Sequence, residues 1–197
     1  MEFDKSITKK NLARSFAGEC QEGARYQFIA QLALKENYKY LESLLKTIAK
    51  NEMAHAKIFY NFIIEKSEGE VDNIQIEAGF PFKANTLLEG LKTSAENEKY
   101  EATNIYPCFA KIAKDEGFLD IADAFLKIAE VENCHYMMTD ELYNKFLNKC
   151  AYKTKTPIKQ KCSNCGHEFI AKEVPKDCPL CHMPKGYYTI KLNDGQN

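Results

Sequence analysis

The sequence lacks the apolar segments that a membrane-spanning or secreted protein needs. Its longest apolar stretches, such as residues 59–64, stop far short of the roughly 20 residues of a membrane span. The opening residues, MEFDKSITKK, contain no apolar core of the kind found in a signal peptide. We therefore expect a soluble, cytoplasmic protein with no membrane partner.

An excess of charge of one sign is also missing, since the formal net charge is −1. The charges are nevertheless divided unevenly: residues 1–150 carry 19 basic and 24 acidic side chains, whereas residues 151–197 carry 8 and 4. Basic runs interleaved with aromatic residues, which would indicate a nucleic-acid surface, do not occur. Nucleic acid is therefore not an expected partner.

The cysteines do not follow the pattern of a disulfide framework. Of the eight, four form two CxxC pairs, Cys162 with Cys165 and Cys178 with Cys181, and the others are scattered singly. Paired cysteines in a chain without secretion signals favour metal binding in a reducing compartment.

Helical periodicity dominates the first part of the chain. Four segments place apolar residues three and four positions apart, approximately at residues 6–35, 37–66, 85–114 and 118–149. Residues 68–83 have no clear period and predict a long connection, plausibly a crossover. Pro107 should kink the third helix, because proline has no amide hydrogen to donate. Residues 1–150 are therefore predicted to form an all-α four-helix bundle.

A second unit follows the bundle. Residues 151–160, AYKTKTPIKQ, are basic and aperiodic, and we interpret them as a linker. Residues 161–197 are rich in glycine, proline and cysteine, and so small a unit normally needs a metal or disulfides to hold a fold. We therefore expect a metal-bound domain of strands and loops here.

Acids and histidines interrupt the apolar faces of all four helices. Glu52 and His55 are three residues apart, as are Glu132 and His135, so each pair lies on one helix face. A single such pair is usually solvated or caps a helix, but two in register indicate more. The complete inward set is Glu19, Glu52, His55, Glu98, Glu132 and His135. Buried carboxylates need cations, and this set is typical of a di-iron or di-manganese site in a bundle. Glu52 and Glu132 are the candidate bridging ligands.

Glu101 adds a fifth carboxylate, one helical turn after Glu98. It is either an ordinary surface acid or a further ligand. If it faces the site, Glu101 and neutral His55 would compete for one iron. Because ferric iron prefers the carboxylate and ferrous iron the imidazole, such competition would form a redox-linked ligand switch.

The four paired cysteines predict a tetrahedral site with sulfur ligands. Cys162, Cys165, Cys178 and Cys181 would hold either zinc or a single iron, and their spacing does not separate the two. Gly166 and Pro179 stand where tight turns around sulfur are expected. His167 and His182 are surplus, and we interpret them as exposed neighbours.

The motifs together resemble the rubrerythrin family. The similar segments are SFAGECQEGARYQF around Glu19, EMAH, AENEKYEATNIYP, FAKIAKDEGF and ENCH, followed by the four-cysteine unit. This resemblance spans nearly the whole chain. It implies a ferritin-like bundle followed by a rubredoxin-like domain.

The resemblance also implies a function. It assigns Glu19, Glu52, Glu98, Glu101, Glu132 and His135 to a di-iron site, with His55 replacing Glu101 on reduction. Tyr26 and Tyr106 match family tyrosines near that site, although either is equally well explained by core packing. The implied activity is a non-haem peroxidase that reduces hydrogen peroxide in oxidative-stress defence. A single iron on the four cysteines would relay electrons from rubredoxin or an NAD(P)H-dependent reductase, in a head-to-tail homodimer.

Two alternatives remain open. A ferritin-like ferroxidase or iron-handling protein would use a similar bundle site without needing the cysteine unit. A zinc-ribbon adaptor with a structural metal site would be colourless and would not turn over peroxide. Cys20 and Cys134, which adjoin candidate ligands, are more typical of small buried side chains than of redox groups.

Overall fold

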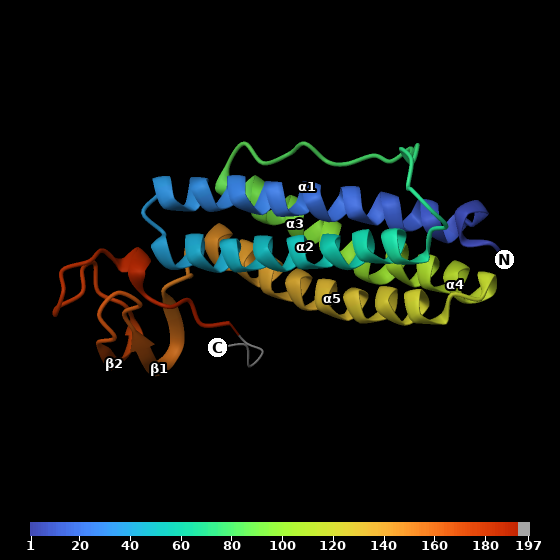
Figure 1. The fold of residues 1–197 in the computed structure, drawn as a ribbon. Coiled ribbons are helices and arrows are strands. Elements are labelled where there is room, and N and C mark those ends of the chain that lie inside the picture. Colours follow the sequence, from blue (N-terminus) through green and yellow to red (C-terminus); the bar gives the residue numbers. More distant parts are fainter. Residues whose placement is uncertain (193–197) are drawn as a thin grey trace.

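The protein begins with a pair of long antiparallel helices. In the computed structural model, which describes residues 1–192, a 3-10 turn (Phe3–Lys5) leads into α1 (Ile7–Lys35), and α2 (Lys39–Lys66) runs back beside it (Figure 1). The Ser6 hydroxyl starts α1 by accepting a hydrogen bond from the Lys9 amide at 3.0 Å. Asn37, with a φ of 63°, follows α1 in the left-handed conformation that closes helices.

Residues 67–86 cross the length of the bundle along α1 (Figure 1). Three side chains of α1 hold this crossover by its carbonyl groups. Arg14 Nε donates to Glu77 O at 3.2 Å, and Gln21 Nε2 and Arg25 Nη2 donate to Pro81 O at 3.3 Å and 3.5 Å. The chain therefore returns to the other end of the bundle before the next helix begins, as the aperiodic connection predicts.

The third predicted helix is divided by a π-helical turn. Helix α3 (Leu87–Tyr100) passes into η2 (Glu101–Ile105) and then into α4 (Tyr106–Glu116). Pro107 lies in the first turn of α4, where a missing amide hydrogen is tolerated. The Tyr106 amide donates to the Glu101 carbonyl five residues back, which is the hydrogen bond of a π turn. The predicted interruption near Pro107 is therefore a change of helix type that begins at Glu101.

Helix α5 (Leu119–Leu147) completes the bundle after Gly117, whose φ of 94° permits the turn out of α4. The four-helix bundle expected from the sequence is confirmed. Two apolar clusters form its core. One contains Leu12, Phe59, Ile121 and Phe125, and the other contains Tyr26, Ile29, Leu45, Leu91 and Leu142. Glu19 on α1, Glu52 on α2 and Glu132 on α5 are buried at the level between these clusters.

The small domain packs against one end of the bundle (Figure 1). Strand β1 (Lys153–Lys161) pairs antiparallel with β2 (Glu168–Glu173), with Lys161 opposite Glu168, and a 3-10 turn η3 (Lys185–Tyr187) follows. Most of the segment 151–160, interpreted from the sequence as an aperiodic linker, is therefore strand. Its side chains are polar on both faces, so no apolar alternation revealed it.

Close backbone contact joins the two domains. A Cβ atom at Gly186 would lie 1.8 Å from the carbonyl oxygen of Asn37, so only glycine fits at this contact. The rings of Tyr38 and Tyr152 stack across the same seam at a centroid distance of 6.2 Å. No helix within residues 1–192 is both long and apolar enough to cross a membrane.

Candidate metal centres

The inward acids and histidines converge at the middle of the bundle. Helix α1 contributes Glu19, α2 contributes Glu52 and His55, α3 contributes Glu98, and α5 contributes Glu132 and His135. None of these six residues is more than 7% exposed. Because each histidine follows its glutamate by three residues, both members of a pair point from the same helix face into this level.

The six side chains form two groups of four possible ligands. One group is Glu19, Glu52, His55 and Glu132, and the other is Glu52, Glu98, Glu132 and His135. Within each group the ligand atoms lie within 4.8 Å of one another. Glu52 and Glu132 belong to both groups, and they are the two residues predicted from the sequence to bridge a metal pair. The chain therefore has a di-metal site of carboxylates and histidines.

The ligand atoms of this site lie close together, but many of them are not satisfied by hydrogen bonds to one another. His55 Nδ1 lies 2.8 Å from Glu132 Oε1, and His135 Nδ1 lies 2.9 Å from Glu52 Oε1. Several of these buried atoms still lack a properly oriented hydrogen bond: Glu19 Oε2, Glu52 Oε1, His55 Nδ1, Glu98 Oε2 and Glu132 Oε1. Oxygen donors mixed with imidazole suit iron or manganese, and cations would satisfy these lone pairs together.

The electrostatics of the site lead to the same conclusion. Burial raises the pKa of Glu19 and Glu98 well above the ordinary range, and the charges of Glu52 and Glu132 raise it further. Burial would also raise the pKa of Glu52, but contacts with His135 and His55 outweigh it and lower the pKa to about 2. Two imidazoles therefore face an excess of buried carboxylates, which favours cation binding.

The histidines respond in the opposite direction. Burial lowers the pKa of each imidazole, but the surrounding carboxylates outweigh burial and raise it to about 12 at His55 and about 9 at His135. His135 Nε2 lies 3.3 Å from the Asn51 side-chain amide, on the side of the ring away from the carboxylates. Asn51 thus holds the ring with Nδ1 facing the site, a role that sequence reasoning missed.

Two buried tyrosines hold acids of the site. Tyr26 donates to Glu98 Oε1 at 2.6 Å, and Tyr106 donates to Glu19 Oε1. Burial is the main cause that raises the pKa of both phenols, so each remains a hydrogen-bond donor. Both tyrosines also belong to the apolar clusters, which means that core packing and ligand orientation coincide at these positions.

Glu101 lies beside the two ligand groups and in neither of them. It opens the π turn, and its Oε1 would be 3.8 Å from a Cβ atom at Gly18, the residue before Glu19. Burial, followed by the charges of Glu22 and Glu19, raises its pKa well above the ordinary range. A cavity of about 230 Å³, lined partly by Phe80 of the crossover, reaches Glu101.

A buried ion pair between Glu22 and Arg25 adjoins the site, and the sequence analysis did not predict it. Arg25 Nη1 donates to Glu22 Oε1 at 2.7 Å, and the two residues are only 3% and 1% exposed. The Asn97 side chain also donates to Glu22. Burial, opposed by Arg25, raises the pKa of Glu22 to about 7. The spacing of three residues from Glu19 to Glu22 and again to Arg25 was the available signal.

The four paired cysteines meet in the small domain. Cys162 Sγ lies 3.8 Å from Cys181 Sγ, and Cys165 Sγ lies 3.7 Å from Cys178 Sγ. A tetrahedron with metal–sulfur bonds of 2.3 Å has edges of about 3.8 Å, so the sulfur atoms are already spaced for one ion. Burial would raise the pKa of Cys178, but backbone amides of Cys181 and Leu180 lower it to about 6, which favours the thiolate that binds metals.

The two cysteine turns repeat one backbone pattern. The Gly166 amide donates to Cys162 O, and the His182 amide donates to Cys178 O, each at 2.9 Å. Gly166 and His182 have φ values of 76° and 58°. The counterpart of Gly166 is therefore His182, whereas Pro179 lies within the second turn. Neither His167 nor His182 belongs to the sulfur cluster.

Cys20 and Cys134 stand apart from both ligand clusters. Cys20 is half-buried, and burial followed by the charge of Glu19 raises its thiol pKa, which disfavours the reactive thiolate. Cys134 lines a surface groove between α2 and α5 that also reaches His135.

Comparisons with known proteins cover almost the whole chain. Residues 10–143 match the family described as Rubrerythrin, and residues 160–189 match its rubredoxin-like domain. The chain is 38% identical to a rubrerythrin of Clostridium perfringens over 93% of each chain. It is 36% identical to a rubrerythrin of Porphyromonas gingivalis over 95% of this chain and 93% of that one.

Solved structures share the fold. A partially reduced nigerythrin has a TM-score of 0.61 at 23% identity and covers 95% of this chain and 90% of its own. A bacterioferritin of Mycobacterium tuberculosis has a TM-score of 0.59 at 16% identity, covering 76% of this chain and 90% of its own. At these identities the likeness concerns the fold alone.

Proposed function

Because the chain belongs to the rubrerythrin family, we propose that it is a peroxidase that reduces hydrogen peroxide to two water molecules, using two electrons and two protons. The observation that carries this proposal is the pair of buried ligand groups sharing Glu52 and Glu132. A pair of ferrous ions held there would supply both electrons together, which avoids the one-electron cleavage that releases hydroxyl radical.

The ligand roles follow from the two groups. Glu52 and Glu132 would bridge the ions, Glu19 and His55 would complete one ion, and Glu98 and His135 the other. Tyr26 and Tyr106 would fix the carboxylates of Glu98 and Glu19 by their hydrogen bonds. Asn51 would hold the His135 ring in register.

Glu101 is proposed as the ligand that alternates with His55. Glu101 starts the π turn, its carboxylate lies beside Gly18, and it lines the cavity under the crossover, so the side chain is not locked in one position by packing. His55 belongs to the same ligand group as Glu19, and its Nδ1 lies 3.4 Å from Glu19 Oε2. An exchange between these two ligands with oxidation state would match the preference of ferric iron for oxygen donors.

Electrons would enter through a single iron on Cys162, Cys165, Cys178 and Cys181, supplied by rubredoxin or an NAD(P)H-dependent reductase. Within one chain, Tyr38, the N-cap of α2 at the seam, lies 14 residues before Glu52, and this length of helix rises about 21 Å. This separation favours transfer to the bundle of a second subunit in a head-to-tail homodimer. We place this activity in the cytoplasm, in oxidative-stress defence.

The test is anaerobic stopped-flow mixing of fully reduced, iron-loaded protein with one equivalent of hydrogen peroxide, together with iron and zinc analysis. We expect rapid oxidation of the bundle irons, followed by loss of the reduced state of an iron-thiolate chromophore. Glu132→Gln should slow the first phase about a thousandfold, because loss of a bridging ligand removes several kcal/mol of stabilisation. Glu130→Gln, an exposed acid on the same helix, is the matched control.

The same experiment separates the alternatives. Zinc on the four cysteines, or peroxide reacting no faster than O₂, would rule out the electron relay and favour an iron-handling ferroxidase. Protein without iron in the bundle and without turnover would favour the structural adaptor.

A further inference from the structure

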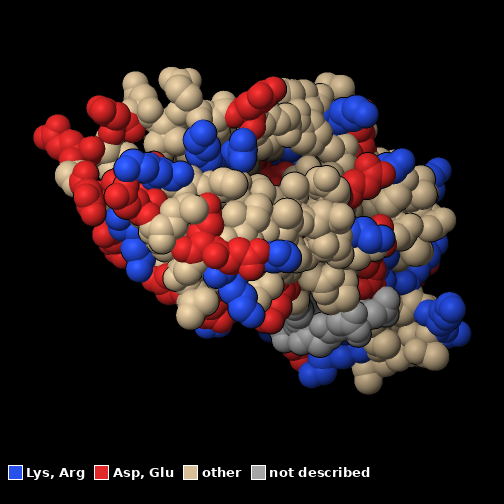
Figure 2. Space-filling model, turned by 90° about the vertical axis from the view of Figure 1, so that its right-hand side faces the viewer, with Lys and Arg blue, Asp and Glu red and all other residues tan. Residues whose placement is uncertain are grey.

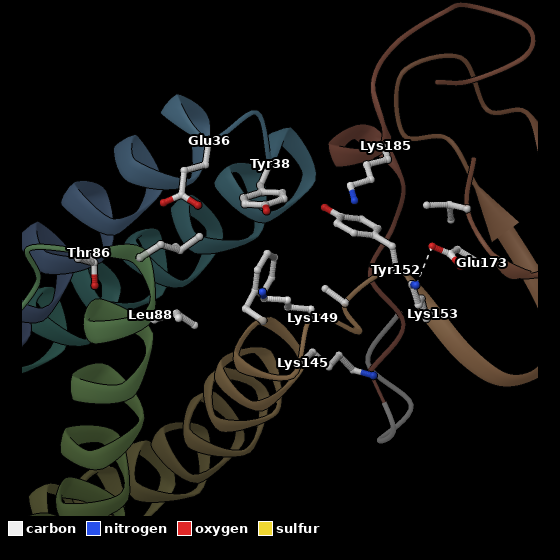
Figure 3. A pocket seen from close by; sticks show the side chains of 14 residues that line it. Glu36, Tyr38, Thr86, Leu88, Lys145, Lys149, Tyr152, Lys153, Glu173 and Lys185 are labelled. Carbon is white, nitrogen blue, oxygen red and sulfur yellow. Dashed lines mark ion pairs between the residues drawn. The ribbon is translucent and has the colours of Figure 1, made fainter. Parts of the chain in front are cut away.

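A cavity of about 530 Å³ lies at the seam between the bundle and the small domain (Figure 3). Tyr38, Leu87 and Phe146 line it from the bundle, and Tyr152 and Lys185 line it from the small domain. Its size is that of a typical small-molecule pocket. Neither metal centre contributes a ligand residue to it, so the cavity is separate from the peroxide chemistry proposed above.

Lysines surround this cavity. Lys145 and Lys149 come from the end of α5, and Lys153 and Lys185 come from the small domain. Lys145 pairs with Glu141 at 3.2 Å and Lys153 pairs with Glu173 at 3.1 Å. Within residues 1–192, Lys149 and Lys185 form no ion pair with an acidic side chain. The lining also includes the acidic residue Glu36, but the two unpaired ammonium groups, one from each domain, leave the cavity with a net positive charge that favours an anion.

The Tyr152 hydroxyl is the unusual polar group of the cavity. Tyr152 is only 8% exposed, and its hydroxyl has no hydrogen-bond partner among the described residues. Its side chain points from the small domain toward the bundle, into the space that the lysines surround (Figure 3). A buried hydroxyl without a hydrogen-bond partner is unfavourable, because it has lost its bond to water without replacing it. An oxygen atom of a ligand would remove this deficit by accepting the proton.

Lys149 adopts a backbone conformation that lysine disfavours. Its φ is 54°, at the position after α5 where glycine or asparagine usually closes a helix. Its amide donates to Phe146 O at 3.1 Å, and the Cys150 amide donates to Lys145 O at 2.9 Å, which complete the cap. The corresponding position after α1 is Asn37, with a φ of 63°. A glycine would serve the cap equally well, so the cap alone does not explain a lysine here.

The remaining walls of the cavity are apolar and aromatic. Tyr38 packs edge-on against Phe146 at 4.9 Å and stacks with Tyr152 at 6.2 Å, and Leu87 and Val174 add aliphatic surface. We propose that this cavity binds a phosphorylated small molecule with a ring-shaped body, of the nucleotide class. The phosphate would contact Lys149, Lys185 and the Tyr152 hydroxyl, and the ring would lie against the aromatic wall. Such a ligand would bridge the two domains.

The test is isothermal titration of the full-length, metal-loaded protein with adenosine monophosphate, adenosine and pyrophosphate as separate probes. We expect adenosine monophosphate to bind with a dissociation constant below about 1 mM. Adenosine, which lacks the charge, and pyrophosphate, which lacks the ring, should each bind at least about tenfold more weakly. Pyrophosphate binding as tight as that of the nucleotide would overturn the ring-bearing ligand, and no binding of any probe would overturn the site.

Two variants locate the binding. Lys149→Gly keeps the helix cap and removes the amine, and Tyr152→Phe keeps the ring and removes the hydroxyl; each should weaken binding at least about tenfold. Lys155→Gln, which alters an exposed lysine of β1 that does not line the cavity, is the control and should leave affinity unchanged. Unaltered affinity in both Lys149→Gly and Tyr152→Phe, with both proteins folded by circular dichroism, would contradict the proposal.

Discussion

The two metal centres differ in how much of the chain each needs. The four cysteines lie within residues 162–181 and are positioned by two short turns with the same backbone hydrogen bonds. The bundle site draws its acids and histidines from helices that span residues 7–147. Its helices are held by apolar clusters on both sides of the acid level, whereas Cys162 and Cys178 pack with a few apolar side chains of the small domain, Val174, Tyr188 and Ile190. We infer that the bundle can fold before it binds metal and that the small domain folds with its metal.

Removal of one sulfur ligand should give the largest effect and tests this difference directly. In Cys178→Ser the small domain should lose its metal and its β1–β2 pairing, because a structural metal site supplies roughly 10 kcal/mol or more to so small a unit. The bundle should keep its helices. Amide hydrogen exchange would measure the loss of protection in residues 153–173, and far-ultraviolet circular dichroism would report the helices.

The matched control is His182→Asn, which alters a residue of the same turn and keeps all four sulfur atoms. Asparagine tolerates the positive φ found at this position. If protection of β1 and β2 survives in Cys178→Ser, or if the helices are lost with the strands, the contrast between the two centres is wrong.

The parts of the site that could be predicted from the sequence are those where an acid or a histidine interrupts the apolar face of a helix. Glu19, Glu52, Glu98 and Glu132 interrupt apolar stripes, so a buried cluster of acids was predictable from spacing alone. The two ExxH pairs placed both histidines on inward faces. These features depend on helix periodicity, which is the most reliable signal in a sequence.

Other features of the structure leave no periodic pattern of apolar residues in the sequence. The π turn at Glu101–Ile105 is a shift in hydrogen-bond register, and Pro107 signals only that some adjustment is needed. The strand Lys153–Lys161 carries polar residues on both faces because it belongs to a two-stranded sheet with little core. Glu22 and Arg25 neutralise each other, so neither appeared to need a metal.

The buried ion pair of Glu22 and Arg25 leads to a prediction about how the stability of the bundle depends on pH. The pKa of Glu22 is raised to about 7, from an ordinary value of about 4.3 in the unfolded chain. The folded state therefore holds this proton more tightly, so the contribution of Glu22 to stability is fully present below about pH 4.3 and is lost as the pH rises to about 7. The loss should be on the order of 3 kcal/mol.

Glu22→Gln should make the fall in stability shallower, because glutamine keeps an oxygen that accepts from Arg25 and Asn97 and does not ionise. The other buried groups with raised pKa values should keep the remaining slope. Urea unfolding of chelator-treated protein between pH 5 and pH 8, followed by helical circular dichroism, would measure the slope. Glu96→Gln, an exposed acid of α3, should keep the slope of the wild-type protein. Parallel slopes in Glu22→Gln and wild type would show that Arg25 fully compensates the burial of Glu22.

The smallest effect concerns the contact between the two regions. In Gly186→Ala the new Cβ would meet the carbonyl oxygen of Asn37 at 1.8 Å, so the small domain must move away from the end of the bundle. Overpacking of this kind costs about 1 to 3 kcal/mol. Because none of the four cysteines and none of the buried acids is among the atoms that the new Cβ would meet, each centre should keep its metal and its spectrum. Small-angle scattering and hydrogen exchange at Tyr38 and Tyr152 would detect the undocked domain. Gly79→Ala, at an exposed glycine of the crossover where a Cβ atom would meet nothing within 4 Å, is the control. If Gly186→Ala instead abolishes metal binding on the cysteines, the docking surface is part of what folds that site, and the small domain is less independent of the bundle than its local turns suggest.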